Sequence, residues 1–398
     1  MHAADLTDVL ERPVQVLKGR GTASRIQGRH ERDSRERADD GWETQSAAML
    51  DAPTVKTVVS DEIAKTILTR NTSPDIPFSV SLNPYRGCEH GCIYCFARPS
   101  HSYLGLSPGL DFETRIFAKV NAAELLRREL AHPGYRPEHI AIGVNTDAYQ
   151  PCERERRLTR QVLEVLHECR HPVGLVTKSA LIERDIDLLA PMAEHGLACA
   201  AITLTTLDSD ISRTLEPRAS APARRLRAIR TLTDAGIPVS VSVAPIIPFI
   251  TEPEIERILE AARDAGAVSA HYTVLRLPWE VNPLFQEWLE AHFPERAARV
   301  MNRIRDMRGG KDYDADFAKR MHGEGVWADL IRQRFTKTVA RLGLGALRGR
   351  FERLDRTQFR RPLVVPAAVA KGAGRGAPHG ANGARHGGGQ GAAQLDLF

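Results

Sequence analysis

Short apolar runs alternate with longer helical patterns along the middle of this chain, and this alternation limits the possible folds more than any other feature. Six apolar or β-branched runs have the length of buried strands. Five segments between them carry apolar residues at helical spacing, as Leu125, Leu126 and Leu130 do in the first. The pattern predicts strands at 79–82, 140–145, 173–177, 199–205, 239–244 and 270–275, and helices at 121–131, 158–169, 184–194, 222–235 and 254–265.

This order of elements predicts an α/β protein with a parallel sheet. Right-handed crossovers build either a doubly wound sheet or a full or partial barrel, and the pattern alone allows both. In either fold the functional residues are expected at the carboxyl ends of the strands. Residues 283–345 predict two or three further helices.

Two polar ends flank the expected globular part. Residues 1–52 are charged and almost without apolar periodicity, which predicts a disordered or loosely docked arm. Residues 363–398 are rich in glycine and alanine, so we expect a flexible tail. Between them we expect the strand–helix domain at 53–282 and a helical extension at 283–362.

The bulk composition narrows the setting in which the chain works. Its net charge of +5 is compatible with nucleic acid but does not establish it. No apolar run approaches the roughly 20 residues of a membrane span, and the start of the chain has no apolar signal core. We therefore expect a cytoplasmic protein without a membrane partner, in which clustered cysteines bind metal or act in catalysis.

Three cysteines stand close together just after the first predicted strand. Cys88 and Cys92 are four positions apart, and Cys95 follows three positions later. Thiolates are soft ligands that suit an iron–sulfur cluster or zinc. Three cysteines leave one iron of a [4Fe–4S] cubane open to a chelating small molecule. The alternative is a zinc site with a fourth ligand from His90 or His101, although structural zinc sites usually combine two C-x₂-C pairs.

This spacing, with the aromatic Phe96 directly after the third cysteine, resembles the signature of the radical S-adenosylmethionine (SAM) superfamily. The resemblance implies a partial (β/α)6 barrel, a [4Fe–4S] cluster, SAM as a second cofactor and a reductant protein. Stretches 176–179, 205–217 and 243–246 are similar to the spore photoproduct lyase-like branch, often labelled DNA repair photolyases. This second resemblance covers about residues 75–280.

The resemblance also implies cofactor-binding residues. Lys178 would bind the carboxylate of SAM, Thr205 would place a hydroxyl against SAM, and Phe96 would lie against the adenine. Asn145 and Asp147 would face the ribose or the methionine part. All except Phe96 are at carboxyl ends of predicted strands, where a cofactor is expected. The alternatives are a solvated surface lysine at position 178 and a turn cap at position 147.

Spore photoproduct lyases use an additional cysteine to quench a product radical, and three remain here. Cys199 is six residues before Thr205, which places it roughly 20 Å lower along its strand at about 3.3 Å per residue. Cys169 ends a predicted helix. Cys152 follows the second strand and is our candidate catalytic residue, although it is further from the cluster than the lyase donor. The alternative is a small half-buried hydrophobe.

The last five residues are Gln394, Leu395, Asp396, Leu397 and Phe398. They resemble the pentapeptide with which bacterial replication and repair proteins bind the replication sliding clamp. Two apolar anchors at the end of a polar tail would let the enzyme search nearby DNA while it is tethered. The alternative is an incidental apolar terminus.

Basic residues gather in two predicted helical regions. They could hold a phosphate backbone, with interleaved aromatic side chains to stack a displaced base. Acidic residues are interspersed, so a solvated helix surface is an equal alternative. The first group is Arg224, Arg225, Arg227 and Arg230, and the second is Arg303, Arg305, Arg308, Lys311, Lys319 and Arg320 with Tyr313, Phe317 and Trp327.

The sequence therefore predicts a radical SAM enzyme that acts on damaged DNA by lyase-like hydrogen abstraction. One alternative keeps the chemistry and changes the substrate to RNA or a protein side chain. Another is a clamp-tethered iron–sulfur or zinc protein that binds DNA without catalysis.

Overall fold

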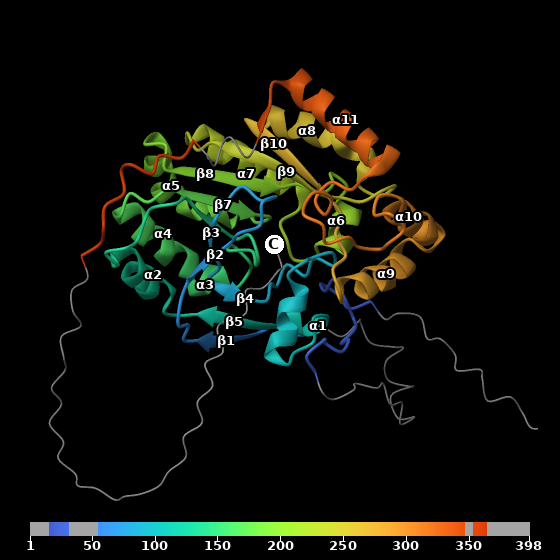
Figure 1. Cartoon of the computed structure of the whole chain (residues 1–398), viewed down its shortest axis with the longest axis horizontal. Helices are drawn as coiled ribbons and strands as arrows, with labels where there is room; N and C mark the ends of the chain where they lie inside the picture. The colour runs from blue at the N-terminus through green and yellow to red at the C-terminus, as the bar shows by residue number, and fades with distance from the viewer. Residues whose placement is uncertain (1–15, 32–54, 347–352, 364–398) are drawn as a thin grey trace, which may run out of the picture.

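A computed structural model describes residues 16–31, 55–346 and 353–363, so the clamp-like peptide at 394–398 lies outside it. In the described residues an eight-stranded sheet forms the centre of the molecule, in the order β11-β10-β9-β8-β7-β6-β3-β2 (Figure 1). Within this sheet all neighbouring strands pair in parallel except β2, which joins the edge antiparallel to β3. The strands are β2 (Leu68–Arg70), β3 (Val80–Leu82), β6 (Ile140–Ile142), β7 (Val173–Thr177), β8 (Ala198–Thr203), β9 (Val239–Ile246), β10 (Ser269–Val274) and β11 (Gly345–Ala346).

A helix follows each of the first five predicted strands and packs on the outer face of the sheet (Figure 1). Their apolar stripes and the strand residues that face them form one continuous core. The predicted alternation of six parallel strands with five helices is confirmed, and the sheet has two unpaired edges, as a partial barrel does. The helices are α2 (Ala122–Ala131), α4 (Leu158–Glu168), α5 (Ile186–Glu194), α7 (Pro222–Asp234) and α8 (Ile255–Asp264).

Alternate residues of β8 show the two sides of the sheet. Ala200 and Ile202 belong to the core beneath the helices. Cys199 and Ala201 point the other way and are buried with Leu354 in a separate cluster. Leu354 therefore fills the inner side of the sheet from a segment far along the chain.

Segment 353–363 crosses the amino ends of the strands. The Asp355 N–H donates to the carbonyl of Gly196 just before β8, at 3.0 Å. The Arg360 N–H donates to the carbonyl of Cys169 just before β7, at 2.7 Å. The segment covers this end of the sheet. The inner space opens at the other end, where the strands have their carboxyl ends.

Strand β6 ends at Ile142, three residues before its predicted end. Gly143 has a φ of +83°, and a Cβ atom there would lie 2.3 Å from the carbonyl oxygen of Val176. Such a backbone conformation and such a close approach both require glycine. Residues 145–147 therefore form a turn across the end of the sheet.

A second, three-stranded sheet in the order β1-β5-β4 was not predicted. It supports the loop that carries the three clustered cysteines. Strand β4 has only two residues, and β1 is largely exposed, so neither gives a clear apolar pattern. This region contains β1 (Val58–Glu62), β4 (Tyr85–Arg86), β5 (Arg115–Lys119), the 3₁₀ helix η1 (Arg98–Leu104) and α1 (Leu110–Thr114).

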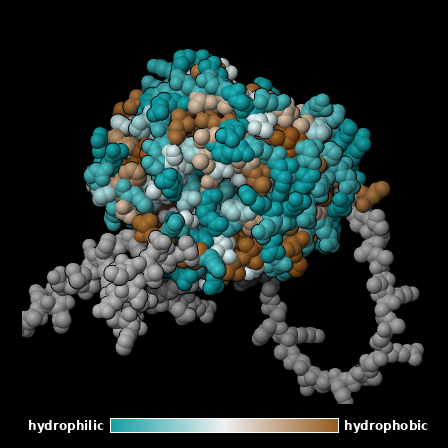
Figure 2. All heavy atoms as spheres, turned by 180° about the vertical axis from the view of Figure 1, so that it is seen from behind, coloured by the Kyte–Doolittle hydropathy of each residue, from teal (hydrophilic) through white to brown (hydrophobic). Residues whose placement is uncertain are grey.

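Three helices follow β10, as predicted for 283–345, and α11 packs on α8 (Figure 1). The view from behind is mostly hydrophilic, with scattered hydrophobic spots (Figure 2). Within the described ranges, no helix is both long and apolar enough to cross a bilayer. The remaining elements are α3 (Glu153–Arg156), η2 (Ala180–Asp185), α6 (Ser209–Leu215), η3 (Glu252–Glu254), α9 (Val281–His292), α10 (Pro294–Asp306) and α11 (Gly325–Leu342).

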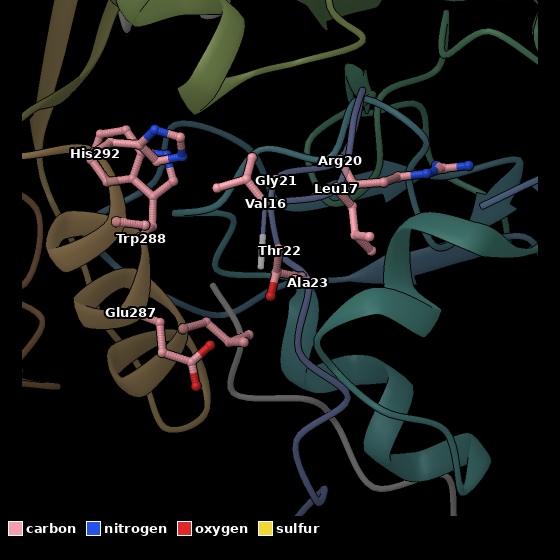
Figure 3. A pocket seen from close by; sticks show the side chains of 11 residues that line it. Val16, Leu17, Arg20, Gly21, Thr22, Ala23, Glu287, Trp288 and His292 are labelled. Carbon is pink, nitrogen blue, oxygen red and sulfur yellow. The ribbon is translucent and has the colours of Figure 1, made fainter. Parts of the chain in front are cut away.

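Residues 16–31 dock beside α9, although they belong to the predicted polar arm. The Ser24 hydroxyl donates to Glu287 of α9 at 2.6 Å. Val16 and Thr22 face Trp288 across a small pocket (Figure 3). This part of the chain is therefore packed against the domain.

Candidate functional site: a cavity at the carboxyl ends of the strands

A cavity of about 500 Å³ opens at the carboxyl ends of the parallel strands. Its size is within the range of small-molecule sites in proteins. The loop after β3, the turn after β6 and the ends of β7 to β10 all contribute to its wall. Seven of the nine predicted site residues line it, namely Cys88, Cys92, Cys95, Phe96, Asn145, Asp147 and Lys178.

The three clustered cysteines come together through tight turns of one loop. The Gly91 N–H donates to the carbonyl of Cys88 at 3.3 Å, and the Cys95 N–H donates to that of Cys92 at 3.2 Å. Gly91 has a φ of +66°, and a Cβ atom there would lie 2.7 Å from a carboxylate oxygen of Glu113. The loop can therefore turn its thiols into the cavity only with glycine at this position.

Arg98 holds the back of the cysteine loop. Its guanidinium donates to the carbonyls of Gly91 and Cys92, at 3.1 and 2.9 Å, and forms an ion pair with Glu113 at 2.5 Å. Glu113 also accepts the N–H of Gly21 at 2.9 Å, from the docked segment 16–31. Both charged side chains are completely buried, so the loop conformation is fixed from behind.

The thiols have the chemistry of soft metal ligands in a dry site. Burial raises the pKa of Cys88, Cys92 and Cys95, and that of Cys92 reaches about 12 although Lys178 opposes the change. The free thiols would therefore keep their protons at neutral pH, and iron would displace them on binding. Three thiols on one cavity wall fit the three protein ligands of a [4Fe–4S] cluster.

The two histidines proposed as a fourth zinc ligand both have other partners. His101 does not line the cavity, and its Nε2 lies 2.9 Å from the carbonyl of Arg115. His90 lines the cavity, but its Nδ1 lies 3.3 Å from the carboxylate of Asp147. In the described part of the chain, no three Cys, His, Asp or Glu side chains converge as ligands of a single ion do.

Asp147 organises the turn after β6 as well as lining the cavity. One carboxylate oxygen accepts the Thr177 hydroxyl at 2.7 Å and the Tyr149 N–H at 2.8 Å, and the other accepts the Lys178 N–H at 2.8 Å. Burial alone would raise the pKa of Asp147, but His90 and these hydrogen bonds lower it to about 2. Asp147 therefore uses most of its hydrogen-bonding capacity to cap the turn, as the turn-cap alternative predicted.

Lys178 and Asn145 keep polar groups available to a ligand. Lys178 is half-buried, and its ammonium lies 5.7 Å from the centre of the Tyr94 ring. Burial lowers the pKa of Lys178, but Cys92 and Glu216 raise it above its usual value, so the side chain stays charged. The Asn145 Oδ1 is buried without a hydrogen-bond partner.

Thr205 does not line the cavity. Its hydroxyl donates to Glu216 at 2.7 Å and lies 3.0 Å from the carbonyl of Ala244. Glu216 also accepts the Tyr94 hydroxyl and forms a buried ion pair with Arg225. Thr205 thus belongs to a polar network under the cavity wall, and its predicted contact with SAM stays a prediction.

Cys152 also lies outside the cavity lining. It is half-buried and packs with Tyr85, Ile116 and Leu158 beside the small sheet. Burial raises the pKa of the Cys152 thiol, and nearby Glu89 raises it further. This geometry matches the half-buried hydrophobe, and it places no donor thiol of Cys152 in the cavity.

The two basic groups do not form continuous patches, which corrects the idea of a phosphate-holding stripe. Arg225 is buried against Glu216. Arg308 is also buried, and Arg320 is buried in an ion pair with Asp75. Four further members pair with nearby acids, as Arg224–Glu183, Arg303–Asp306, Arg305–Asp312 and Lys319–Glu324.

Several residues of the site gave no signal of their own in the sequence. Tyr94 and Glu216 stand inside quoted motifs, but only the fold shows that they meet. Arg276 follows β10 and His271 lies within it, and neither stands in a motif. Position after a strand was the one signal that could have indicated Arg276.

Comparison with known proteins relates the middle of the chain to a known superfamily. The sequence profile of the Radical SAM superfamily matches residues 82–262, which include the three cysteines and strands β6 to β9. Residues 82–262 therefore match the Radical SAM superfamily, whose members use a [4Fe–4S] cluster and SAM.

Two curated relatives match over about half of the chain. An uncharacterized protein of Mycobacterium tuberculosis is 36% identical over 226 residues, which cover 56% of this chain and 66% of the relative. An uncharacterized protein of Methanocaldococcus jannaschii is 24% identical over 222 residues, which cover 56% of this chain and 79% of the relative. The chain thus matches just under two thirds of the mycobacterial protein's length.

Among solved structures, spore photoproduct lyase complexed with dinucleoside spore photoproduct matches with a TM-score of 0.47 and 15% identity. The match covers 72% of this chain and 80% of that chain.

Proposed function

We propose that this chain is a cytoplasmic radical SAM enzyme that repairs damaged DNA by hydrogen abstraction, in a spore photoproduct lyase-like way. The observation that carries the proposal is the meeting of Cys88, Cys92 and Cys95 with Lys178 around one cavity. When bound, the cluster supplies the electron that cleaves SAM to a 5′-deoxyadenosyl radical.

The chain's own residues would bind SAM and keep water away from it. The charged Lys178 would bind the methionine carboxylate, and the Asn145 Oδ1, which has no hydrogen-bond partner, would accept from a ribose hydroxyl or the amino group. Phe96 lines the same cavity and would pack against the adenine. Asp147 would act chiefly by linking the turn that carries Asn145 to the backbone N–H of Lys178.

The proposed DNA substrate has support from two parts of the sequence. Stretches 176–179, 205–217 and 243–246 resemble the lyase-like branch. The clamp-like peptide at 394–398 would recruit the enzyme to replicating DNA by raising its local concentration. A reductant protein would supply electrons to the cluster.

The test is formation of 5′-deoxyadenosine by anaerobically reconstituted protein with SAM, a reductant and DNA. More 5′-deoxyadenosine with UV-irradiated than with unirradiated DNA is expected. A Cys92→Ala variant should form none, because it lacks a cluster ligand. Equal formation with both DNA samples would move the substrate to RNA or a protein side chain. No formation by an intact cluster would overturn the proposed radical chemistry.

Clamp recruitment is tested separately. Full-length protein should bind an immobilised bacterial sliding clamp in surface plasmon resonance, and a variant that ends at residue 393 should not. Alanine at Leu397 and Phe398 should have the same effect as the deletion, because these are the apolar anchors. Equal binding by all variants would remove the clamp from the proposal.

A further inference from the structure

Arg276 brings an unpaired positive charge to the cavity wall beyond β10. Its side chain lines the cavity and is buried, with 8% exposure. The guanidinium lies over the Phe96 ring, 5.2 Å from its centre. It hydrogen-bonds to the Tyr313 hydroxyl and approaches the Met321 sulfur at 3.7 Å, while its Nε has no partner.

The acids that could neutralise Arg276 are occupied elsewhere. No carboxylate forms an ion pair with it among residues 16–31, 55–346 and 353–363. Asp75 shares the cavity wall and its charge raises the pKa of Arg276, but Arg320 holds both of its oxygens, at 2.6 and 2.8 Å. Asp147 is used by the turn after β6.

A second buried guanidinium stands behind the first. Arg308 donates to the carbonyls of Leu275 and Lys319, at 2.9 and 2.7 Å, and its Nε has no partner. Burial lowers the pKa of Arg276, and it lowers that of Arg308 to about 10, so both stay charged at neutral pH. Buried charge without a counter-charge is costly, so this end of the cavity favours an anionic ligand.

SAM does not account for this second cation. Its single carboxylate is assigned above to Lys178 at the end of β7, and β8 and β9 separate that strand from β10. A guanidinium fork matches the oxygens of a phosphate better than any other side chain does. We infer that Arg276 binds a backbone phosphate of the nucleic-acid substrate, a step that deepens the proposed function and rests on it.

A phosphate held beside Phe96 would fix the position of the substrate relative to SAM. Contacts to phosphate set register without reading base sequence. The subsite would therefore place the damaged nucleotide in the cavity whatever its neighbours are.

The experiment measures binding of a fluorescein-labelled, UV-irradiated oligonucleotide to cluster-loaded full-length protein with SAM, by anaerobic fluorescence anisotropy. Arg276→Gln should weaken binding about tenfold or more, because a charge-assisted hydrogen bond is lost. Arg276→Lys, which keeps the charge, should lose less. Arg227→Gln, on the exposed face of α7, is the matched control and should bind like wild type. Iron content and circular dichroism verify that each variant is folded.

A second probe isolates the phosphate. An oligonucleotide with one neutral methylphosphonate at the lesion should bind wild type about as weakly as Arg276→Gln binds the normal strand. Equal binding of both strands by wild type and Arg276→Gln would overturn the inference.

Inorganic phosphate, titrated calorimetrically, separates this inference from the proposed function. If wild type ignores DNA but binds phosphate through Arg276, the proposed substrate is wrong and the anion subsite stands. If wild type binds phosphate no better than Arg276→Gln and neither responds to DNA, both proposals fail. Binding of an acidic peptide in place of DNA, lost in Arg276→Gln, would assign the subsite to a carboxylate and overturn the phosphate assignment.

Discussion

Arg98 and Glu113 form an ion pair at 2.5 Å with no exposed surface on either side chain, directly behind the loop of the cluster cysteines. Arg98 links this pair to the loop because it also holds the carbonyls of Gly91 and Cys92. The shape of the metal site therefore depends on a buried charge that does not touch the metal.

Arg98→Lys should weaken both the fold and iron retention. Lysine keeps the charge but cannot reach two carbonyls and a carboxylate with one fork. We expect a loss of about 3 kcal/mol in the free energy of unfolding and less than the full iron content after reconstitution. Urea denaturation and iron analysis measure these. Arg127→Lys, in the exposed pair with Glu168, is the control and should change stability by less than about 0.5 kcal/mol.

Glu216→Gln should destabilise the protein by about 3 kcal/mol or more, because it leaves Arg225 charged, buried and unpaired. Removing both charges should cost less than removing one. A double-mutant cycle with Arg225→Met, measured by urea unfolding, checks this. Additive losses would show that the two side chains act independently.

Asp147→Asn should lose the acceptor for the Lys178 N–H, since an amide nitrogen cannot accept it. The folded-state pKa of about 2 is below the ordinary 3.8, so the carboxylate's contribution is complete above about pH 4 and disappears as the pH falls toward 2. The stability gap between wild type and variant, of order 2 kcal/mol at pH 7, should shrink between about pH 4 and pH 2. A constant gap would contradict this assignment.

The sequence predicts the features that depend on local contacts. The six parallel strands and their helices follow from apolar spacing, because each element buries one face. The cysteines follow from their spacing. The hydrogen bond from Thr205 to Glu216 could not be predicted, because a position near the end of a strand does not show which side chain meets it. The packing of Cys152 could not be predicted, because the small sheet beside it gives no clear sequence pattern. Arg276 was missed because an unpaired charge is visible only when every nearby acid has been located.

His171 should make the protein less stable in mild acid. Its ring is buried, with Nδ1 3.0 Å from the carbonyl of Pro172 and Nε2 2.7 Å from the Tyr135 hydroxyl. Burial lowers its pKa from 6.5 to about 4, so the unfolded chain takes up the proton first as the pH falls through this window. Relative to His171→Gln, wild type should lose of order 3 kcal/mol between pH 7 and pH 4. Parallel stability curves for the two proteins would argue against a buried neutral imidazole.

Cys152→Ser should retain SAM cleavage and substrate turnover within about threefold, because the thiol lies outside the cavity. The measurement is 5′-deoxyadenosine and repaired product per enzyme, with Cys169→Ser as the matched control at a helix end. SAM cleavage with loss of repaired product in Cys152→Ser alone would restore its role as hydrogen donor.

Segment 353–363 lies across the amino ends of β7 and β8, on the side opposite the cavity. The last described residues therefore lie on the face opposite the cavity. A partner bound beside the last described residues would leave the mouth of the cavity unobstructed. Anchoring and chemistry could then proceed together, without competition for one surface.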